Sequence, residues 1–502
     1  MTPQAAYDEL IRRVREQATL GACIALLEWD ELTYMPPGGV AGRAQQLAYL
    51  AGLEHGKATD PRLGELLAVV EGSPLLHEPT SAEAVNVREI RRSYMRLARL
   101  PRTLVEEVAR VAPVSQHHWA MARQEGDFEL WRPWLEKMVA LKRQEAQCLS
   151  ANDPYDALLD DYEPGARSDD IARLFAALRQ ELTPLLAAIA QSRKKPRLAI
   201  LRRHYSLEQQ RSFGMEVAAA LGFDFQRGRL DTAVHPFSSR IGPGDCRITT
   251  RYSPNQFSDS FFAILHEVGH ALYEQGLDPA ADGTPMGEPP SLGMHEAQSR
   301  LWENLVGRSL PFWKHFFPRA RQVFPEALGE VSLNAFYLAI NHVAPSLNRV
   351  QSDEVTYNLH ILIRFELEKD LLSGDLPVAD LPAAWNRLYQ KYLGLTPGND
   401  ADGCLQDGHW SEGMFGYFPT YTLGNLFAAQ LFDRVRAEIG NLAEQFHQGD
   451  FRGLLTWLRR QIYLQGSRYR AGKLIEIATG KPPDHGPLVR MLREKYGELY
   501  GI

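Results

Sequence analysis

The sequence contains few cysteines, no long apolar run and no strong excess of charge of one sign. Its four cysteines lie far apart and form no CxxC pair, which argues against a disulfide scaffold or a cysteine-ligated zinc site. No run of about 18 apolar residues is present, so no membrane span is expected. The formal net charge is −7, from 55 basic and 62 acidic residues. This balance argues against a general affinity for nucleic acid.

The N-terminal segment also lacks the features of an export signal. Residues 1–20 alternate apolar and charged side chains at helical spacing, without the basic start and unbroken apolar stretch of a signal peptide. Together with the scarce cysteines, this pattern predicts a protein of the reducing cytoplasm. Hydrophobic residues make up 44% of the 502 residues and charged residues 23%, which is ordinary globular usage and excludes wholesale disorder.

Helical periodicity dominates the chain. Apolar residues recur at three- and four-residue spacing over about residues 7–222, and the pattern returns from about residue 259. Residues 229–252 differ, because they are rich in Thr, Val, Ile and Ser and contain Gly242-Pro243-Gly244. This composition predicts two short strands joined by a turn, and such a pair more plausibly forms one wall of a site than a core.

No convincing linker divides the chain. We therefore expect a mainly α fold in which residues 1–502 form a single body, with a short β-hairpin or small sheet beside a groove. Within this body, residues 1–225 are predicted to form a helical lid or wall. Residues 226–502 are predicted to carry the functional site and the groove.

The strongest chemical signal is the HEVGH stretch that begins at His266. Its apolar flanks favour a helix, on which His266 and His270 lie four residues apart and share a face. Two imidazoles placed in this way can bind one Zn²⁺, and Glu267 between them can take a proton from water. The alternative is an amphipathic helix with two surface histidines. The apolar flanks argue against it, since unpaired buried histidines and a buried glutamate are costly.

A catalytic zinc needs a third protein ligand, and the sequence offers several acidic residues. Glu296 is the favoured one, because it lies early in a second apolar-periodic helix that can pack against the first. Its alternative role is a helix-start carboxylate that stabilises the helix dipole. Glu303, seven residues on, can orient a ligand histidine from behind. The other downstream acids considered are Glu274, Asp278, Asp282 and Glu288.

At this point the sequence resembles the carboxypeptidase Taq family of metallocarboxypeptidases over nearly its whole length. The resemblance rests on several separate motifs in the same order. They are LLEWDELTYMPPGG (residues 26–39), YDALLDDYEPG (155–165), HPF (235–237), DCRIT (245–249), HEVGH (266–270), HEAQ (295–298), GCLQDGHW (403–410) and FGYFPTY (415–421). The HEAQ segment supplies the third metal ligand in the family, which strengthens the assignment of Glu296.

The sequence departs from the family pattern at two places. The IRxxAD element is replaced by residues 348–353, in which the arginine and the aspartate remain but the Ile and Ala positions have changed. Near the C-terminus, residues 463–469 lack the usual histidines. Both changes leave the metal motif intact, so they bear on substrate preference rather than on the metal centre.

The resemblance implies removal of single residues from a free peptide C-terminus by one divalent metal ion, with zinc favoured and cobalt a substitute. Glu267 is then the general base, and His409 and Tyr421 are the expected donors to the carbonyl oxygen. Three arginines can bind the terminal carboxylate, in this order of preference: Arg349, Arg468 and Arg247. The alternative role of each is a structural ion pair.

The resemblance further implies a bowl-shaped homodimer that acts on peptides. Nucleic acid and membranes are not expected partners. Two alternatives remain open at this stage. One is a metallo-oligopeptidase that cleaves internally with the same zinc ligands. The other is a non-catalytic peptide-binding protein, which the intact Glu267 argues against, since a binding module does not need this base.

Overall fold

The computed structural model describes residues 1–149 and 153–502, and the expected mainly α architecture is confirmed. Thr2 and Ser81 cap the first and fourth helices by accepting hydrogen bonds from backbone N–H groups. The helices of the first half are α1 (Pro3–Thr33), α2 (Val40–Ala58), α3 (Pro61–Val70), α4 (Ala82–Arg99), α5 (Arg102–Glu125), α6 (Arg132–Leu149), α7 (Pro154–Leu159), α8 (Ser168–Gln191) and α9 (Leu207–Leu221).

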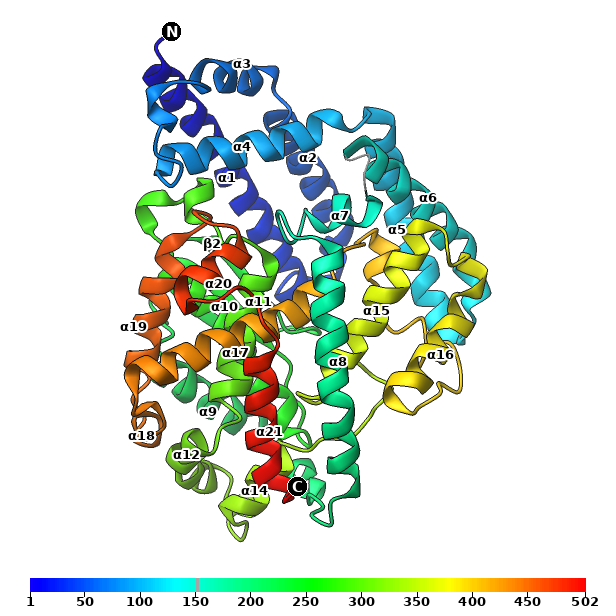
Figure 1. Ribbon diagram of the computed structural model, residues 1–502, viewed down its shortest axis with the longest axis vertical. Helices are drawn as coiled ribbons and strands as arrows, with labels where there is room; N and C mark the ends of the chain where they lie inside the picture. Colours follow the sequence, from blue (N-terminus) through cyan, green and yellow to red (C-terminus); the bar gives the residue numbers. More distant parts are fainter. Residues whose placement is uncertain (150–152) are drawn as a thin grey trace.

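The second half is also helical and carries most of the buried residues (Figure 1). A π-helix, η7 (Leu301–Val306), directly follows α11. The α-helices are α10 (Phe257–Gly276), α11 (Leu292–Arg300), α12 (Leu310–Val323), α13 (Pro325–Leu328), α14 (Leu333–Ile340), α15 (Thr356–Ser373), α16 (Leu381–Leu393), α17 (Pro419–Ile439), α18 (Leu442–His447), α19 (Arg452–Gln461), α20 (Ala471–Thr479) and α21 (Gly486–Tyr500). Among the described residues, every helix is too short or too polar to cross a membrane.

A small sheet of three strands packs against α10. The strands are β1 (Gly228–Thr232), β2 (Ser238–Gly242) and β3 (Asp245–Thr250), in the order β1-β3-β2. β2 and β3 are antiparallel across the predicted glycine turn, whereas β1 pairs with β3 in parallel. The expectation of two strands is wrong, because the described chain has three here. The first expected strand covers residues 231–239, which are instead the end of β1, a break around Pro236 and the start of β2. Proline cannot donate a ladder hydrogen bond.

Two hydrophobic cores hold the described chain together. The main core extends from α5 to α21 and includes the buried face of α10. A second, smaller core joins α1, α3 and α4, which lie together near the N-terminus (Figure 1). We call α1–α4 the lid. The other helices of residues 1–225 pack into the main core. The predicted division of the chain at residue 225 stays a prediction.

Candidate metal centre

Helix α10 presents the two histidines of the HEVGH motif on one face. Its apolar side chains are buried in the main core, which fixes the rotation of the helix. His266 and His270 lie one turn apart, with ring centroids separated by 5.0 Å. Only about a fifth or less of each side chain is exposed, at 20% and 14%. The helix thus directs two imidazole nitrogens toward one point, as the spacing predicted.

Glu296 of α11 completes the group. Its Oε2 atom lies 3.6 Å from Nε2 of His266 and 3.5 Å from Nε2 of His270. The three ligand atoms lie within 4.8 Å of one another, and no other group of this kind occurs in the part of the chain that the structure describes. Ligand atoms around a tetrahedral ion with bonds of about 2.0–2.1 Å are about 3.3 Å apart. The two histidines and the glutamate therefore fit a single divalent ion.

The remaining acidic candidates for the third ligand are engaged elsewhere. Glu274 accepts a hydrogen bond from Nε2 of His295 at 2.7 Å. Glu288 pairs with Arg240 at 3.0 Å. Among the acids that the sequence left open, Glu296 is the one whose carboxylate lies near both histidines, because α11 packs against α10.

Glu303 orients one of the ligand histidines. Its Oε2 atom lies 3.0 Å from Nδ1 of His266. Burial acts to raise the pKa of Glu303, but the hydrogen bond from His266 and the charge of Arg300 lower it to about 2. The group is therefore an ionised acceptor, so Nδ1 carries the proton and Nε2 keeps its lone pair for the metal. The π-helix η7 carries Glu303, and π-helical turns are frequent at functional sites.

Replacing Glu303 with glutamine is expected to weaken zinc affinity by about 10- to 100-fold, because the neutral amide makes the His266 ring less basic and less well oriented. Competition with a chromophoric chelator measures this loss. Glu326→Gln, on the exposed surface of α13, is the matched control and should leave the affinity unchanged. Equal affinities for the two variants would show that Glu303 does not support the ligand.

The predicted general base is buried beside the ligands. Glu267 is only 6% exposed. Its carboxylate accepts no hydrogen bond from the described residues. Burial raises the pKa of Glu267 to about 7. A metal ion held by the neighbouring histidines would lower the pKa of Glu267, because its positive charge favours the ionised carboxylate. The group is therefore free to accept a proton near neutral pH.

His409 and Tyr421 lie together, as the motifs implied. Nε2 of His409 is 3.2 Å from the hydroxyl of Tyr421, and Tyr417 packs against both rings. Burial lowers the pKa of His409 to about 4, so its imidazole is neutral. Burial raises the pKa of Tyr421 well above 10, with a further contribution from Glu296. Both groups therefore keep a proton that can be donated at neutral pH.

The first-choice arginine reaches this cluster but is held in an ion pair. Arg349 donates from Nε and Nη2 to Asp407, at 2.9 and 2.7 Å, and from Nη1 to the hydroxyl of Tyr357 at 3.1 Å. Its guanidinium lies 5.0 Å from the ring centroid of Tyr421. Arg364 donates to the other oxygen of Asp407 at 2.7 Å. Two guanidinium groups thus share one carboxylate, which leaves an excess of positive charge at this end of the site.

The other two arginines lie where the lid contacts the body. Arg468 donates to the backbone carbonyl of Thr80 in the lid. Arg247 pairs with Asp245 at 2.7 Å and lies over the ring of Trp29 on α1, 4.2 Å from its centroid. The structure therefore brings only Arg349 to the His409 and Tyr421 cluster, and substrate binding by Arg468 or Arg247 stays a prediction.

Two glycines that the sequence analysis did not single out allow the ligand helices to meet. A Cβ on Gly269 would lie 2.5 Å from Cα of Ser299 and 2.6 Å from the carbonyl oxygen of Gln298. A Cβ on Gly424 of α17 would lie 2.7 Å from Cγ of Glu296. Both positions require close helix approach, and Gly269 could have been noticed from its place inside the HEVGH motif.

Glu163 was also missed, although it lies in the motif at 155–165. Its carboxylate accepts a hydrogen bond from the backbone N–H of Gly293 in the first turn of α11. The backbone carbonyl of Tyr162 accepts from Leu292 at 3.0 Å. Burial raises the pKa of Glu163 to about 8. This segment therefore fixes the start of the helix that carries Glu296.

Comparison with known proteins identifies the family. The family described as carboxypeptidase Taq (M32) metallopeptidase matches residues 9–496. The chain belongs to this family. It is 50% identical to thermostable carboxypeptidase 1 of Thermus thermophilus, over 100% of each chain. It is 35% identical to carboxypeptidase 1 of Bacillus subtilis, over 99% of each. The M32 carboxypeptidase structure from Deinococcus radiodurans superposes with a TM-score of 0.96 at 42% identity, covering 99% of this chain and 100% of that one.

Family membership and site geometry agree. The M32 family consists of metallopeptidases, and these relatives are carboxypeptidases, so the chain is a metallocarboxypeptidase. The resemblance drawn from the motifs is confirmed, and the oligopeptidase and binding-protein alternatives are not favoured. A divalent metal ion is part of this activity, and the two histidines with Glu296 form the site that fits it.

Proposed function

We propose that His266, His270 and Glu296 hold one zinc ion, for which cobalt can substitute, and that the enzyme removes single residues from peptides with a free C-terminus. The convergence of three ligand atoms within 4.8 Å is the observation that carries this proposal. When bound, the ion supplies a Lewis acid that polarises the scissile carbonyl and lowers the pKa of a water molecule. Imidazole and carboxylate ligands accept several first-row ions, so cobalt is a chemically reasonable substitute.

The chain's own residues move the protons. Glu267 accepts a proton from the attacking water and then delivers it to the leaving amine. His409 and Tyr421 donate hydrogen bonds to the carbonyl oxygen as negative charge develops on it. Their neutral, protonated state at neutral pH, which follows from burial, supports this role.

Arg349 is the proposed partner of the terminal carboxylate. Three of its five N–H donors are used by Asp407 and Tyr357, so two remain for a substrate. We expect Arg349→Lys to lower kcat/KM for peptides with a free C-terminus by about tenfold or more, because a hydrogen-bonded charge pair is lost. The measurement compares free-acid and amidated peptides. A variant that discriminates between them as strongly as the wild type would exclude this role.

Amidation of the substrate tests the proposed function itself. A carboxypeptidase should lose most activity when the C-terminal carboxylate is replaced by an amide, because the positive charge around Arg349 then has no partner. An oligopeptidase should accept both forms. Equal cleavage of the free and amidated peptides by metal-loaded protein would therefore favour internal cleavage.

We also propose a cytoplasmic homodimer. All four cysteines are free, as expected for a reducing compartment. None of the residues of α2 is buried in the described chain. Two large apolar side chains on this helix, Tyr49 and Leu53, are 69% and 44% exposed. A second copy is expected to cover this face. Light scattering after size exclusion should give twice the monomer mass for the wild-type protein. Tyr49→Glu should lower the measured mass toward that of the monomer. A wild-type monomer would contradict the proposal.

A further inference from the structure

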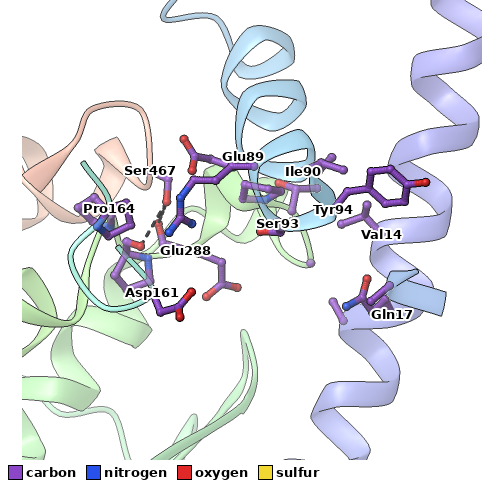
Figure 2. Close-up of a pocket in the computed structure, with 18 of the residues that line it drawn as sticks. Val14, Gln17, Glu89, Ile90, Ser93, Tyr94, Asp161, Pro164, Glu288 and Ser467 are labelled. Atoms are coloured by element: carbon purple, nitrogen blue, oxygen red, sulfur yellow. Dashed lines mark hydrogen bonds between the residues drawn. The ribbon is translucent and has the colours of Figure 1, made fainter. Parts of the chain in front are cut away.

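An open cavity with a volume of about 600 Å³ lies between the lid and the body. Val14 and Gln17 of α1 line one side, and Tyr94 of α4 lies above them (Figure 2). Asp161 and Glu288 line the opposite side, which belongs to the body (Figure 2). A cavity of this size can take several peptide residues, and its two walls come from separately packed parts of the chain.

The cavity borders the metal centre. His295 lines it and stacks on the ligand His270, with ring centroids 4.5 Å apart. Tyr162 also lines it and packs edge-to-face on Tyr417, at 5.1 Å, beside Tyr421. The cavity therefore lies beside the metal centre, one aromatic ring away from His270 and from Tyr417.

Carboxylates dominate the charged groups of this cavity. Asp161 and Glu288 are 41% and 52% exposed at their side chains, and their partners Arg96 and Arg240 bind them from outside the lining. Glu274 deeper in the wall is only 10% exposed, and its two oxygens lie 2.7 Å from Nε2 of His295 and 3.4 Å from Nε of Arg240. The further acidic lining residues are Glu54 and Glu89, and the basic ones are Arg92 and His295.

The charges at the two ends of the site have opposite signs. Arg349 and Arg364 share Asp407 beside Tyr421, which leaves positive charge there. The cavity near His295 instead presents carboxylates. A terminal carboxylate is attracted to the first end and repelled by the second. This difference orients a bound peptide, with its C-terminus at Arg349 and its preceding residues in the cavity.

We propose that the cavity is a subsite for substrate residues that precede the scissile bond, and that Asp161 and Glu288 make it prefer a lysine or arginine side chain there. The inference rests on the proposed carboxypeptidase function and specifies its substrate class. A cationic side chain placed in the cavity is attracted by Asp161 and by the ionised form of Glu288, whose pKa burial raises to about 7. An acidic side chain is repelled. Partly exposed charge pairs are modest in strength, so the expected preference is a factor of a few rather than a strict requirement.

Equilibrium binding tests this proposal independently of turnover. The peptides are N-acetylated pentapeptides that share a C-terminal leucine and carry lysine, leucine or glutamate at the two positions before the scissile bond. They are titrated calorimetrically into zinc-loaded Glu267→Gln protein, which retains the metal ligands. We expect lysine peptides to bind about three- to tenfold more tightly than glutamate peptides, and the ratio to shrink in 0.5 M salt.

Paired variants locate the preference. Adding Asp161→Asn and Glu288→Gln should bring the lysine-to-glutamate ratio close to one. Adding Glu125→Gln and Glu136→Gln, which make the same charge change on exposed positions of α5 and α6, should leave the ratio as it is. Circular dichroism and zinc content confirm folding of each protein.

Two results would overturn the subsite. They are a lysine-to-glutamate ratio near one in the parent protein, or a ratio that the cavity substitutions leave unchanged. Failure of the proposed function gives a different result. In that case wild-type protein releases no terminal leucine from any of the peptides, whatever the binding ratio of the Glu267→Gln protein.

Discussion

Replacing Glu267 with glutamine is expected to lower kcat by about 10²- to 10⁴-fold, the range in which general acid–base catalysis contributes. Glutamine preserves the size of the side chain but cannot take a proton from water. His266, His270 and Glu296 are unchanged, so zinc affinity should remain within a few-fold of the wild type. The measurement pairs steady-state kinetics on an N-blocked peptide with a chelator competition on the same preparation.

The two readouts separate a lost base from a disturbed metal centre. If activity and zinc affinity fall together, Glu267 supports the ligands rather than the proton transfer. If activity is retained, another group is the base. Glu412→Gln, an exposed carboxylate at the end of the 3-10 helix that begins at His409, serves as the matched control and should keep wild-type kinetics.

Gly269→Ala should have the second large effect, a loss of both zinc affinity and stability. The added Cβ would lie 2.5 Å from the backbone of Ser299, so α10 and α11 must move apart. This movement separates the two histidines from Glu296, whose Oε2 atom lies 3.6 Å from Nε2 of His266 and 3.5 Å from Nε2 of His270 in the wild type. We expect zinc affinity to fall by about tenfold or more and the free energy of unfolding to fall by about 1–3 kcal/mol.

Gly52→Ala on α2 is the control for the same chemical change in a helix. A Cβ at Gly52 meets no atom within 4 Å, so the substitution should be neutral or stabilise the protein by up to about 1 kcal/mol. Thermal unfolding of the metal-free proteins gives the stability change, and chelator competition gives the affinity. Wild-type behaviour of Gly269→Ala would mean that the two ligand helices do not depend on this contact.

The juxtaposition of the proposed metal ligands could be predicted in part from local periodicity. Two histidines four residues apart must share a helical face. Spacing alone left Glu296 as one of several acids, and the family resemblance favoured it. The position of Glu303 behind a ligand histidine could be predicted from its spacing to Glu296. The π-helical turn that carries Glu303 could not be predicted from the sequence. The helical character of the chain follows from the same three- and four-residue spacing.

The partners in long-range pairs could not be predicted. A structural ion pair is the alternative role of Arg349 in the sequence analysis, but its partner Asp407 lies 58 residues away and binds two of its nitrogens. Nothing in the local pattern at either position indicates the other. The parallel pairing of β1 with β3 is a contact of the same kind. The small lid core was also missed, because its residues come from α1, α3 and α4 and show ordinary amphipathic spacing.

The central claim is tested most directly by mass spectrometry of an N-terminally blocked peptide incubated with the protein. Zinc- and cobalt-loaded samples are compared with a chelator-treated sample. The account predicts a ladder of products, each shorter by one C-terminal residue, that disappears with chelator and returns when metal is restored. Internal fragments, or no cleavage by protein with one metal ion bound per chain, would contradict it.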